Sequence, residues 1–155
     1  MLAPDLSPDR QEHVAAMLAA LRQAGLRLTP QRVAVCQALA ESKAHPTAQT
    51  LFEQLAARHS AFSRATVYNT LETLARMGLA QQVLVAGDSA MRFDANLELH
   101  AHLVCSRCHR VEDYAGPDLA DQTAAVERRT GYTLRGLCVF YYGCCPDCQA
   151  AEKIE

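Results

Sequence analysis

The chain has 155 residues, of which 50% are hydrophobic, 21% are charged and 6% are aromatic. This composition is typical of a compact soluble protein and excludes a disordered, collagen-like or coiled-coil polymer. No apolar run approaches the about 18 to 20 residues of a membrane-spanning helix, and the acids and prolines of residues 1–10 do not resemble a secretory signal peptide. We therefore expect a cytoplasmic protein with one larger domain or two small ones.

The net charge of −2 excludes a uniformly basic nucleic-acid-binding protein but not a local basic face. Residues 1–78 hold eight Arg and Lys against six Asp and Glu, whereas residues 79–155 hold seven against eleven. The N-terminal half is therefore the half better suited to contact a polyanion such as nucleic acid.

Helical periodicity and capping residues predict four helices in the first 78 residues. The first helix covers Leu6–Arg22 and ends near Gly25. Each of the others begins at a residue whose side-chain oxygen can accept a hydrogen bond from the backbone of the first turn. These N-cap residues are Thr29, Thr47 and Ser63. Short consecutive helices of this kind predict a helix-turn-helix arrangement.

Two strands are predicted next, at Gln81–Val85 and Met91–Phe93, around the turn-rich segment 86–89. Helices followed by such a hairpin form a winged helix, so we assign residues 1–94 to a winged-helix domain. Residues 95–99 are a connector. Beyond it we predict strands at 103–105, 111–114 and 132–142 and a helix at 118–130, which together make residues 100–155 a second, small unit. The predicted fold class is α+β.

Seven cysteines in a chain without an export signal favour metal binding over disulfide bonds. Four of them form Cys-x-x-Cys pairs, Cys105 with Cys108 and Cys145 with Cys148. Each spacing lets a tight turn aim two thiolates at one point, and two such turns complete the tetrahedral shell of structural zinc. We choose Cys145 over the adjacent Cys144 because its spacing to Cys148 matches the first pair. Bound zinc would contribute on the order of 10 kcal/mol to the folding of so small a unit.

Two other interpretations of these cysteines remain open, ordinary buried thiols and a redox-active pair. A metal hydrolase or a thiol oxidoreductase is the competing class of protein. A hydrolase needs an open metal position beside a general base, and a closed four-cysteine shell offers none. We therefore expect a protein that is not an enzyme.

A second group of candidate ligands contains no sulfur. His100 and His102 lie on one side of an extended segment because strand side chains alternate, and Asp94 and Asp113 are near them in sequence. Nitrogen and oxygen ligands suit an exchangeable ion such as Fe²⁺ or Mn²⁺ better than structural zinc. The alternative is a surface histidine pair with solvated aspartates. Three other histidines are interpreted as surface or loop residues: His13, His59 and His109.

The fourth predicted helix carries polar side chains near its N-terminal end that suit the major groove of DNA. Such side chains contact phosphates and base edges when a recognition helix enters the groove. They are Arg64, Thr66, Tyr68 and Asn69. The alternative is an exposed amphipathic helix without a ligand.

Several segments of the sequence occur together, in a consistent order, between residues 21 and 148. They are His45-Pro-Thr-Ala48, Ser63-Arg-Ala-Thr-Val-Tyr-Asn-Thr-Leu71, Arg92-Phe-Asp-Ala-Asn96, His100-Ala-His-Leu-Val-Cys105 with Cys108, and Tyr142-Gly-Cys-Cys-Pro-Asp-Cys148. With these motifs the chain resembles the ferric uptake regulator (Fur) family of bacterial metal-dependent repressors.

The resemblance implies a homodimer that binds a palindromic promoter operator in double-stranded DNA. It implies an N-terminal winged-helix DNA-binding domain, a hinge at residues 95–99 and a C-terminal dimerisation domain with structural Zn²⁺ on the four paired cysteines. It also implies a regulatory Fe²⁺ or Mn²⁺ site that includes His45, which spacing alone does not select. The implied regulatory ligands are His45, Asp94, His100, His102 and Asp113. One ion bound across the hinge would favour the geometry that fits the duplex.

The branch of the family is indicated by three residues. Asp94 and Asp113 stand where iron-sensing members commonly have glutamates, and Asn69 stands where they commonly have arginine. These choices resemble the peroxide-sensing branch, in which bound Fe²⁺ reacts with peroxide and a histidine ligand is oxidised, here His45 or His100. Mn²⁺ would fill the same site without reacting. The alternative is a pure metal-level sensor for manganese or iron on the same scaffold.

Overall fold

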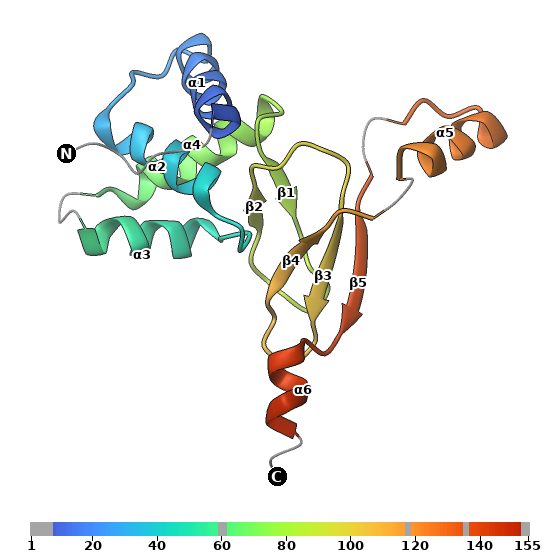
Figure 1. Ribbon diagram of the computed structural model, residues 1–155. Helices are drawn as coiled ribbons and strands as arrows, with labels where there is room; N and C mark the ends of the chain where they lie inside the picture. Colours follow the sequence, from blue (N-terminus) through green and yellow to red (C-terminus); the bar gives the residue numbers. More distant parts are fainter. Residues whose placement is uncertain (1–7, 59–61, 117–118, 135–136, 153–155) are drawn as a thin grey trace. The chain divides into compact units, whose positions relative to one another are not determined.

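The computed structural model describes residues 8–58, 62–116, 119–134 and 137–152. The chain divides into two compact units, an N-terminal unit of residues 1–97 and a C-terminal unit of residues 98–155. Helices dominate the first unit and a sheet the second, so the predicted α+β class is confirmed (Figure 1). No helix in the described part of the chain is both long and apolar enough to cross a membrane.

Among its described residues the N-terminal unit has four helices and a two-stranded antiparallel hairpin. The elements are α1 (Pro8–Gln23), α2 (Pro30–Glu41), α3 (Ala48–Arg58), α4 (Arg64–Arg76), β1 (Gln81–Val83) and β2 (Arg92–Asp94). Apolar side chains from all four helices form one buried cluster with Phe93 of β2. Burial of this apolar surface is the main term that stabilises the unit.

The predicted N-cap residues lie where the sequence indicated. The hydroxyl of Thr29 accepts a hydrogen bond from the backbone of Arg32, at 3.4 Å. That of Thr47 accepts from the backbone of Thr50, at 3.0 Å. The hydroxyl of Ser63 does the same for the first turn of α4. Each cap satisfies a backbone donor that the first turn of a helix leaves without an intrahelical partner.

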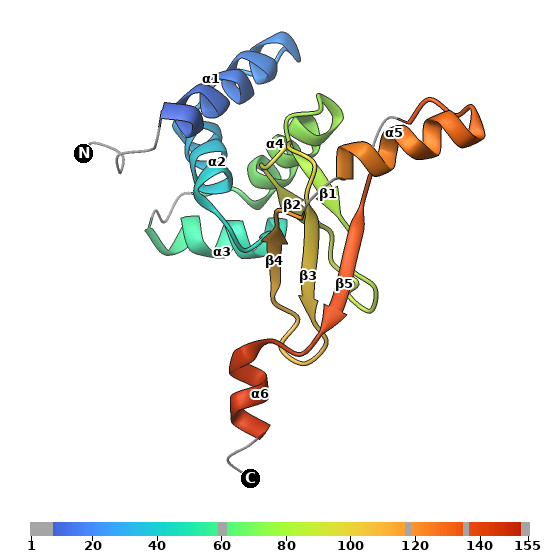
Figure 2. The same ribbon diagram turned by 45° about the vertical axis from the view of Figure 1, so that its right-hand side comes forward.

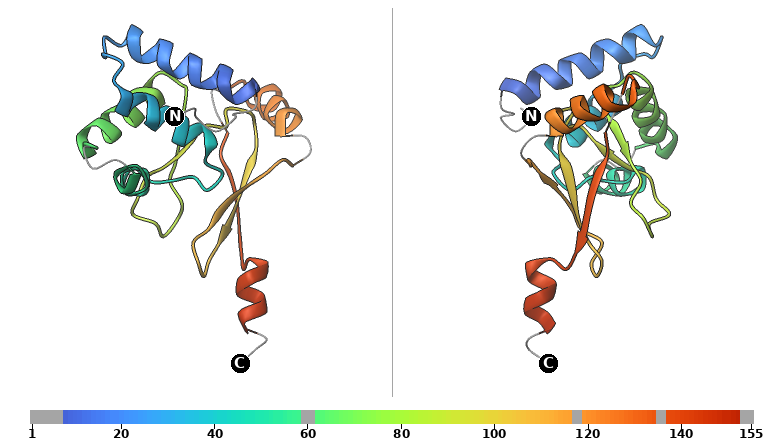
Figure 3. Two further views of the ribbon diagram at one scale, coloured as in Figure 1. Left: turned by 60° about the vertical axis from the view of Figure 1, so that its left-hand side comes forward. Right: turned by 90° about the vertical axis from the view of Figure 1, so that its right-hand side faces the viewer.

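Strand β1 is shorter than predicted, because Leu84 and Val85 lie beyond the register that pairs Gln81–Val83 with Arg92–Asp94. Strand β2 has the predicted length but is shifted by one residue from the expected Met91–Phe93. The loop between the two strands extends beyond the helices of the same unit (Figure 3). On its other side β2 contacts the segment before α3, where the amide of Phe93 donates to the carbonyl of Pro46 at 2.9 Å. The hairpin is therefore fastened to the start of α3.

The C-terminal unit holds a three-stranded sheet in the order β4-β3-β5. Strand β4 runs antiparallel to β3, and β5 runs parallel to it (Figure 2). A parallel pair needs a long crossover connection, and here the crossover carries a helix. The elements are β3 (Ala101–Cys105), β4 (Val111–Tyr114), α5 (Leu119–Thr130), β5 (Val139–Gly143) and α6 (Pro146–Glu152).

Three features of this unit differ from the sequence-based expectation. The strand predicted at 103–105 begins two residues earlier, at Ala101. The predicted strand at 132–142 begins only at Val139, because its partner β3 offers just five residues for pairing. The seven-residue helix α6 was not predicted, since so short a segment has no helical periodicity to detect.

Candidate metal centres

The register of the central strand β3 brings candidate ligands together within the C-terminal unit. His102 pairs with Asp113 on β4, and Cys105 pairs with Gly143 at the end of β5. Side chains alternate along a strand, so His102 and Cys105 serve different faces and ends of the sheet. The strand thus contributes to two groups of ligands of different chemistry.

The four paired cysteines lie together where β3 and β5 end. Their sulfur atoms all lie within 4.8 Å of one another, and the sulfurs of Cys108 and Cys145 are 3.8 Å apart. A tetrahedron with zinc–sulfur bonds of about 2.3 Å has edges of about 3.8 Å. The sulfur group therefore fits a tetrahedral Zn²⁺ ion in ligand type, number and spacing.

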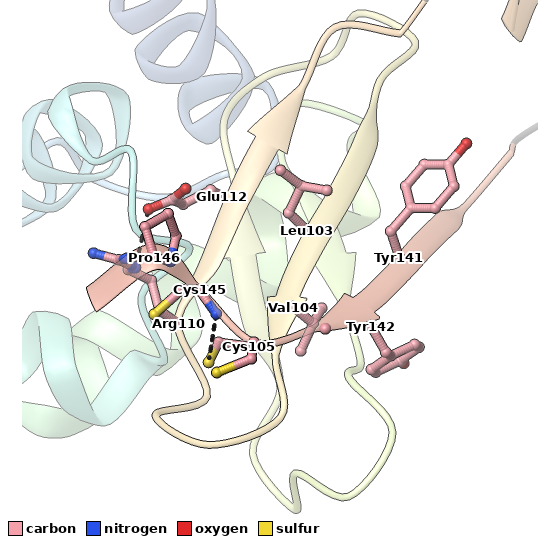
Figure 4. Close-up of a pocket in the computed structure, with 11 residues that line it drawn as sticks. Leu103, Val104, Cys105, Arg110, Glu112, Tyr141, Tyr142, Cys145 and Pro146 are labelled. Atoms are coloured by element: carbon pink, nitrogen blue, oxygen red, sulfur yellow. Dashed lines mark hydrogen bonds and ion pairs between the residues drawn. The ribbon is translucent and has the colours of Figure 1, made fainter. Parts of the chain in front are cut away.

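Backbone amides make this group ready for a cation. Figure 4 shows the amide of Cys145 directed at the sulfur of Cys105, a distance of 3.4 Å. Hydrogen bonds from the backbone of Cys108, and then of Cys145 and Arg107, lower the pKa of Cys105 from 9.0 to about 5. Hydrogen bonding to Cys145 and then desolvation raise the pKa of Cys148 to about 12. In the absence of metal one thiol is thus ionised at neutral pH and another keeps its proton.

Two arginines of the first cysteine turn contact α6, which carries Cys148. Arg107 donates to the carbonyl of Cys148 at 3.2 Å. Arg110 forms ion pairs with Asp147 of α6 and with Glu112 of β4, each at 3.0 Å. These contacts connect the two cysteine turns, and no pattern in the sequence predicts them.

His109 follows Cys108 with a φ of 58°, a left-handed conformation that is uncommon outside glycine. Its amide donates to the carbonyl of Cys105 at 3.0 Å, which closes the first cysteine turn. His109 is an exposed loop residue, as predicted, and its backbone also closes the cysteine turn.

The remaining thiols lie outside the four-sulfur group. Cys36 is buried among the helices, and desolvation raises its pKa to about 12. Cys138 is exposed. Cys144 is next to Cys145 in sequence and lines, with Leu103 and Tyr141, a cavity of about 250 Å³ beside the sulfur group (Figure 4).

The nitrogen and oxygen ligands of the C-terminal unit also converge. The ligand atoms of His100, His102 and Asp113 lie within 4.8 Å of one another, and the Nε2 of His100 is 3.3 Å from Asp113. The Nδ1 of His100 lies 2.8 Å from the carbonyl of Glu98. In the tautomer that donates this hydrogen bond, Nε2 carries the lone pair that can bind a metal. The set fits a divalent ion that accepts nitrogen and oxygen ligands.

The N-terminal unit holds the other two predicted ligands side by side. His45 and Asp94 are both buried, and the Nε2 of His45 lies 3.4 Å from a carboxylate oxygen of Asp94. His45 has a φ of 46°. Its imidazole and this carboxylate are again ligands of the nitrogen and oxygen type.

The candidate DNA-contact residues lie in the first turns of α4. Arg64, Tyr68 and Asn69 are exposed, and Thr66 is half-buried. The guanidinium of Arg64 lies 5.0 Å above the ring of Phe52 on α3. Val67 and Leu71 of the same helix are fully buried, so α4 is anchored by one face and presents the polar face to solvent.

Comparison with known proteins agrees with the resemblance seen in the motifs. The sequence model of the ferric uptake regulator family matches residues 23–142. The peroxide-responsive repressor PerR of Staphylococcus aureus is 36% identical over 132 residues, which cover 85% of this chain and 88% of the repressor.

Solved structures agree as well. The crystal structure of the Campylobacter jejuni peroxide stress regulator is similar with a TM-score of 0.69 and 30% identity, over 84% of this chain and 98% of that protein. The ferric uptake regulator of Helicobacter pylori, described with three functional metal-binding sites, is similar with a TM-score of 0.74, over 96% of this chain and 97% of that one. Its identity is 19%, so it bears on the fold alone.

Adjacent cysteines allow a matched test of the sulfur group. We expect Cys145→Ser to lose most of its bound zinc and to destabilise the C-terminal unit, because the tetrahedral shell loses a thiolate. Cys144→Ser should retain one zinc per chain and the stability of the unchanged protein. Zinc content by plasma mass spectrometry and thermal unfolding by circular dichroism measure both. Equal zinc loss in the two variants would contradict the assignment.

Proton release on zinc binding tests the charge state of the sulfur group. Because the pKa of Cys105 is lowered to about 5, this group is already ionised at pH 7 and releases no proton, whereas Cys148 with a pKa of about 12 must release one. We expect at least one and fewer than four protons per zinc, from calorimetry in buffers of different ionisation enthalpy. Zinc affinity should fall by about tenfold or more per pH unit near pH 7, because Cys148 must release its proton, and more steeply below about 5, where Cys105 is protonated as well. Circular dichroism of the metal-free protein is the control, since an unfolded unit would release nearly four protons.

Proposed function

This chain belongs to the ferric uptake regulator family, and on that premise we propose that it is a metal-dependent DNA-binding repressor that responds to peroxide. It acts in the bacterial cytoplasm as a homodimer on a palindromic operator in promoter DNA. Residues 1–94 form the DNA-binding domain, residues 95–99 the hinge and residues 100–155 the dimerisation domain. Regulators of this family bind DNA and are not enzymes.

The observation that carries the proposal is the set of nitrogen and oxygen ligands. Within the N-terminal unit His45 lies beside Asp94, and within the C-terminal unit His100 and His102 converge with Asp113. All five residues share one regulatory ion in the proposal. The aspartates, together with the 36% identity to a peroxide-responsive repressor, support the peroxide-sensing branch.

The two groups of ligands have different tasks. Cys105, Cys108, Cys145 and Cys148 hold Zn²⁺ as a structural ion, because four thiolates close the coordination shell. The nitrogen and oxygen ligands hold Fe²⁺ or Mn²⁺. They bind this ion less tightly than four thiolates bind zinc, so the ion can exchange. Shared binding links the two units and populates the geometry that fits DNA. Without the ion that geometry is rarely populated and affinity for the operator falls.

Peroxide acts on the histidine ligands. A bound Fe²⁺ ion would supply the redox chemistry, by which the imidazole of His45 or His100 would gain one oxygen atom from peroxide while the other oxygen leaves as water. The oxygenated ring is a poor ligand, so the regulatory ion is lost and repression ends. Each molecule reacts once, which is why the protein is a sensor and not a catalyst.

The second candidate function is a pure metal-level sensor for manganese or iron. It is favoured by the ligand set itself, because imidazoles and carboxylates bind Mn²⁺ as well as Fe²⁺ and Mn²⁺ does not react with peroxide in this way. The two functions share the DNA-binding mechanism. They differ in whether peroxide oxidises His45 or His100.

Variants on α4 test the proposed DNA contacts. We expect Asn69→Ala to lose about 1 to 3 kcal/mol of discrimination at one operator position, because an amide reads a base edge. Arg64→Gln should weaken binding to all sequences and lower the salt slope by about 1, because a guanidinium binds a phosphate. Fluorescence anisotropy at several salt concentrations measures both. Arg76→Gln, at the exposed end of the same helix, is the matched control and should bind as the unchanged protein does.

The proposed function is tested by peptide mass spectrometry on zinc-replete protein loaded with either Fe²⁺ or Mn²⁺ and exposed to low peroxide, with operator binding measured in parallel. We expect the peptide with His45 or His100 to gain one oxygen with Fe²⁺ only, together with loss of DNA binding. Unmodified histidines combined with metal-dependent DNA binding would instead establish the metal-level sensor. Absence of any metal-dependent DNA binding would contradict both functions.

A further inference from the structure

Arg92, the first residue of β2, joins two distant parts of the N-terminal unit. Its Nη1 donates to the carbonyl of His45 at 3.3 Å. Its Nε and Nη2 lie 3.0 and 2.9 Å from one carboxylate oxygen of Asp88 in the hairpin loop. The two side chains are only 18% and 19% exposed, so solvent screens this ion pair less than it screens a surface pair.

Asp88 organises the tip of the hairpin. Its amide donates to the carbonyl of Val85, and its other carboxylate oxygen accepts from the amide of Ala90, each at 3.0 Å. An aspartate that accepts from the backbone two residues ahead stabilises a turn. The position of the Asp88 carboxylate therefore sets the shape of the loop between β1 and β2.

At the other end of the guanidinium, His45 is held in an unusual backbone conformation. Its φ of 46° is left-handed, and such conformations in residues other than glycine persist only where the surroundings hold them. Three consecutive residues of β2 do so. Arg92 binds the His45 carbonyl, the amide of Phe93 donates to Pro46, and the Asp94 carboxylate lies beside the His45 imidazole.

We propose that Arg92 is a positioning residue that couples the conformation of His45 to the tip of the hairpin, the wing of the winged helix. The inference rests on the proposed function, in which His45 is a ligand of the regulatory ion and the hairpin belongs to the DNA-binding domain. It adds that the shape of the hairpin tip affects DNA binding. Movement of the imidazole on metal binding shifts the carbonyl of the same constrained residue. One planar guanidinium binds both partners at once, so a shift of the His45 carbonyl displaces the Asp88 carboxylate as well.

Two simpler roles give different results. If Arg92 contacts a DNA phosphate, its loss weakens DNA binding with and without metal and lowers the salt slope by about 0.9. If it only holds the fold, its loss lowers the melting temperature and the affinity for metal. If Arg92 couples the two sites, its loss mainly lowers the ratio of the DNA dissociation constant without metal to the one with metal. This ratio measures the coupling between metal binding and DNA binding.

The experiment measures that ratio on zinc-replete, full-length protein with Mn²⁺ as the regulatory ion, for Arg92→Gln, Arg92→Lys and Asp88→Asn. Asparagine keeps the acceptor for the Ala90 amide and removes the charged partner of Arg92. Lysine keeps the charge of Arg92 but cannot hold both partners with one ammonium group. Arg76→Gln is the matched control for loss of one positive charge.

We expect the ratio to fall about 3- to 10-fold in all three variants and not in the control. In Asp88→Asn, which keeps the contact of Arg92 with the His45 carbonyl, the Mn²⁺ dissociation constant of the DNA-free protein should change less than about 2-fold. Linkage requires the tightening of Mn²⁺ binding by DNA to fall by the same factor. In the double variant of Asp88→Asn with Arg92→Gln the ratio should fall no further than in Arg92→Gln alone, because both substitutions break the same link between Arg92 and Asp88.

Unchanged ratios in Arg92→Gln and Asp88→Asn, while the unchanged protein responds to Mn²⁺, would overturn the inference and leave the proposed function intact. Equal weakening of DNA binding in both metal states would also overturn it, in favour of a phosphate contact. If Arg92→Gln fails to fold, Asp88→Asn decides alone. If the unchanged protein gains no DNA affinity from Mn²⁺, the proposed function itself fails, and the inference with it.

Discussion

The hydrogen-bonded register of β3 is the constraint on which the C-terminal unit depends. One strand of five residues carries His102 in its interior and Cys105 at its end, and it pairs on one side with β4 and on the other with β5. A slip of one residue would turn every side chain of the strand to the opposite face. Both His102 beside Asp113 and the approach of Cys105 to Cys145 would then be lost. The register of the sheet therefore sets the positions of the candidate metal ligands in this unit.

Ligand chemistry divides the work between the two groups. Four thiolates form a closed site that suits a soft metal ion such as zinc. Backbone hydrogen bonds lower the pKa of Cys105, so the thiolate form that binds metal is favoured even without an ion. In the proposed function imidazoles and carboxylates form the more labile site, and the hydrogen bond from His100 to the carbonyl of Glu98 orients one ring for it. In this proposal His102 and Cys105, three positions apart on one strand, serve a regulatory ion that exchanges and a structural ion that stays bound.

The sequence predicted most of the N-terminal unit because its signals are local. An N-cap hydroxyl and the first turn of its helix lie within three residues of each other, so Thr29, Thr47 and Ser63 could be recognised without knowledge of the fold. The Cys-x-x-Cys spacing is equally local. Prediction was weaker where pairing decides structure: the strand expected at 132–142 is limited by the length of β3, and α6 is too short to show a period.

By itself the sequence determined the α+β class, the helix starts, the two cysteine pairs and, through several motifs in register, the family. It selected His45 only through that resemblance, since no spacing connects residue 45 to residues 94–113. Only the tertiary structure decided that Arg110 ties β4 to α6 and that Arg92 joins His45 to Asp88. Arginine side chains are long and their partners lie up to 47 residues away, so these contacts exist only once the backbone has folded and leave no pattern in the chain.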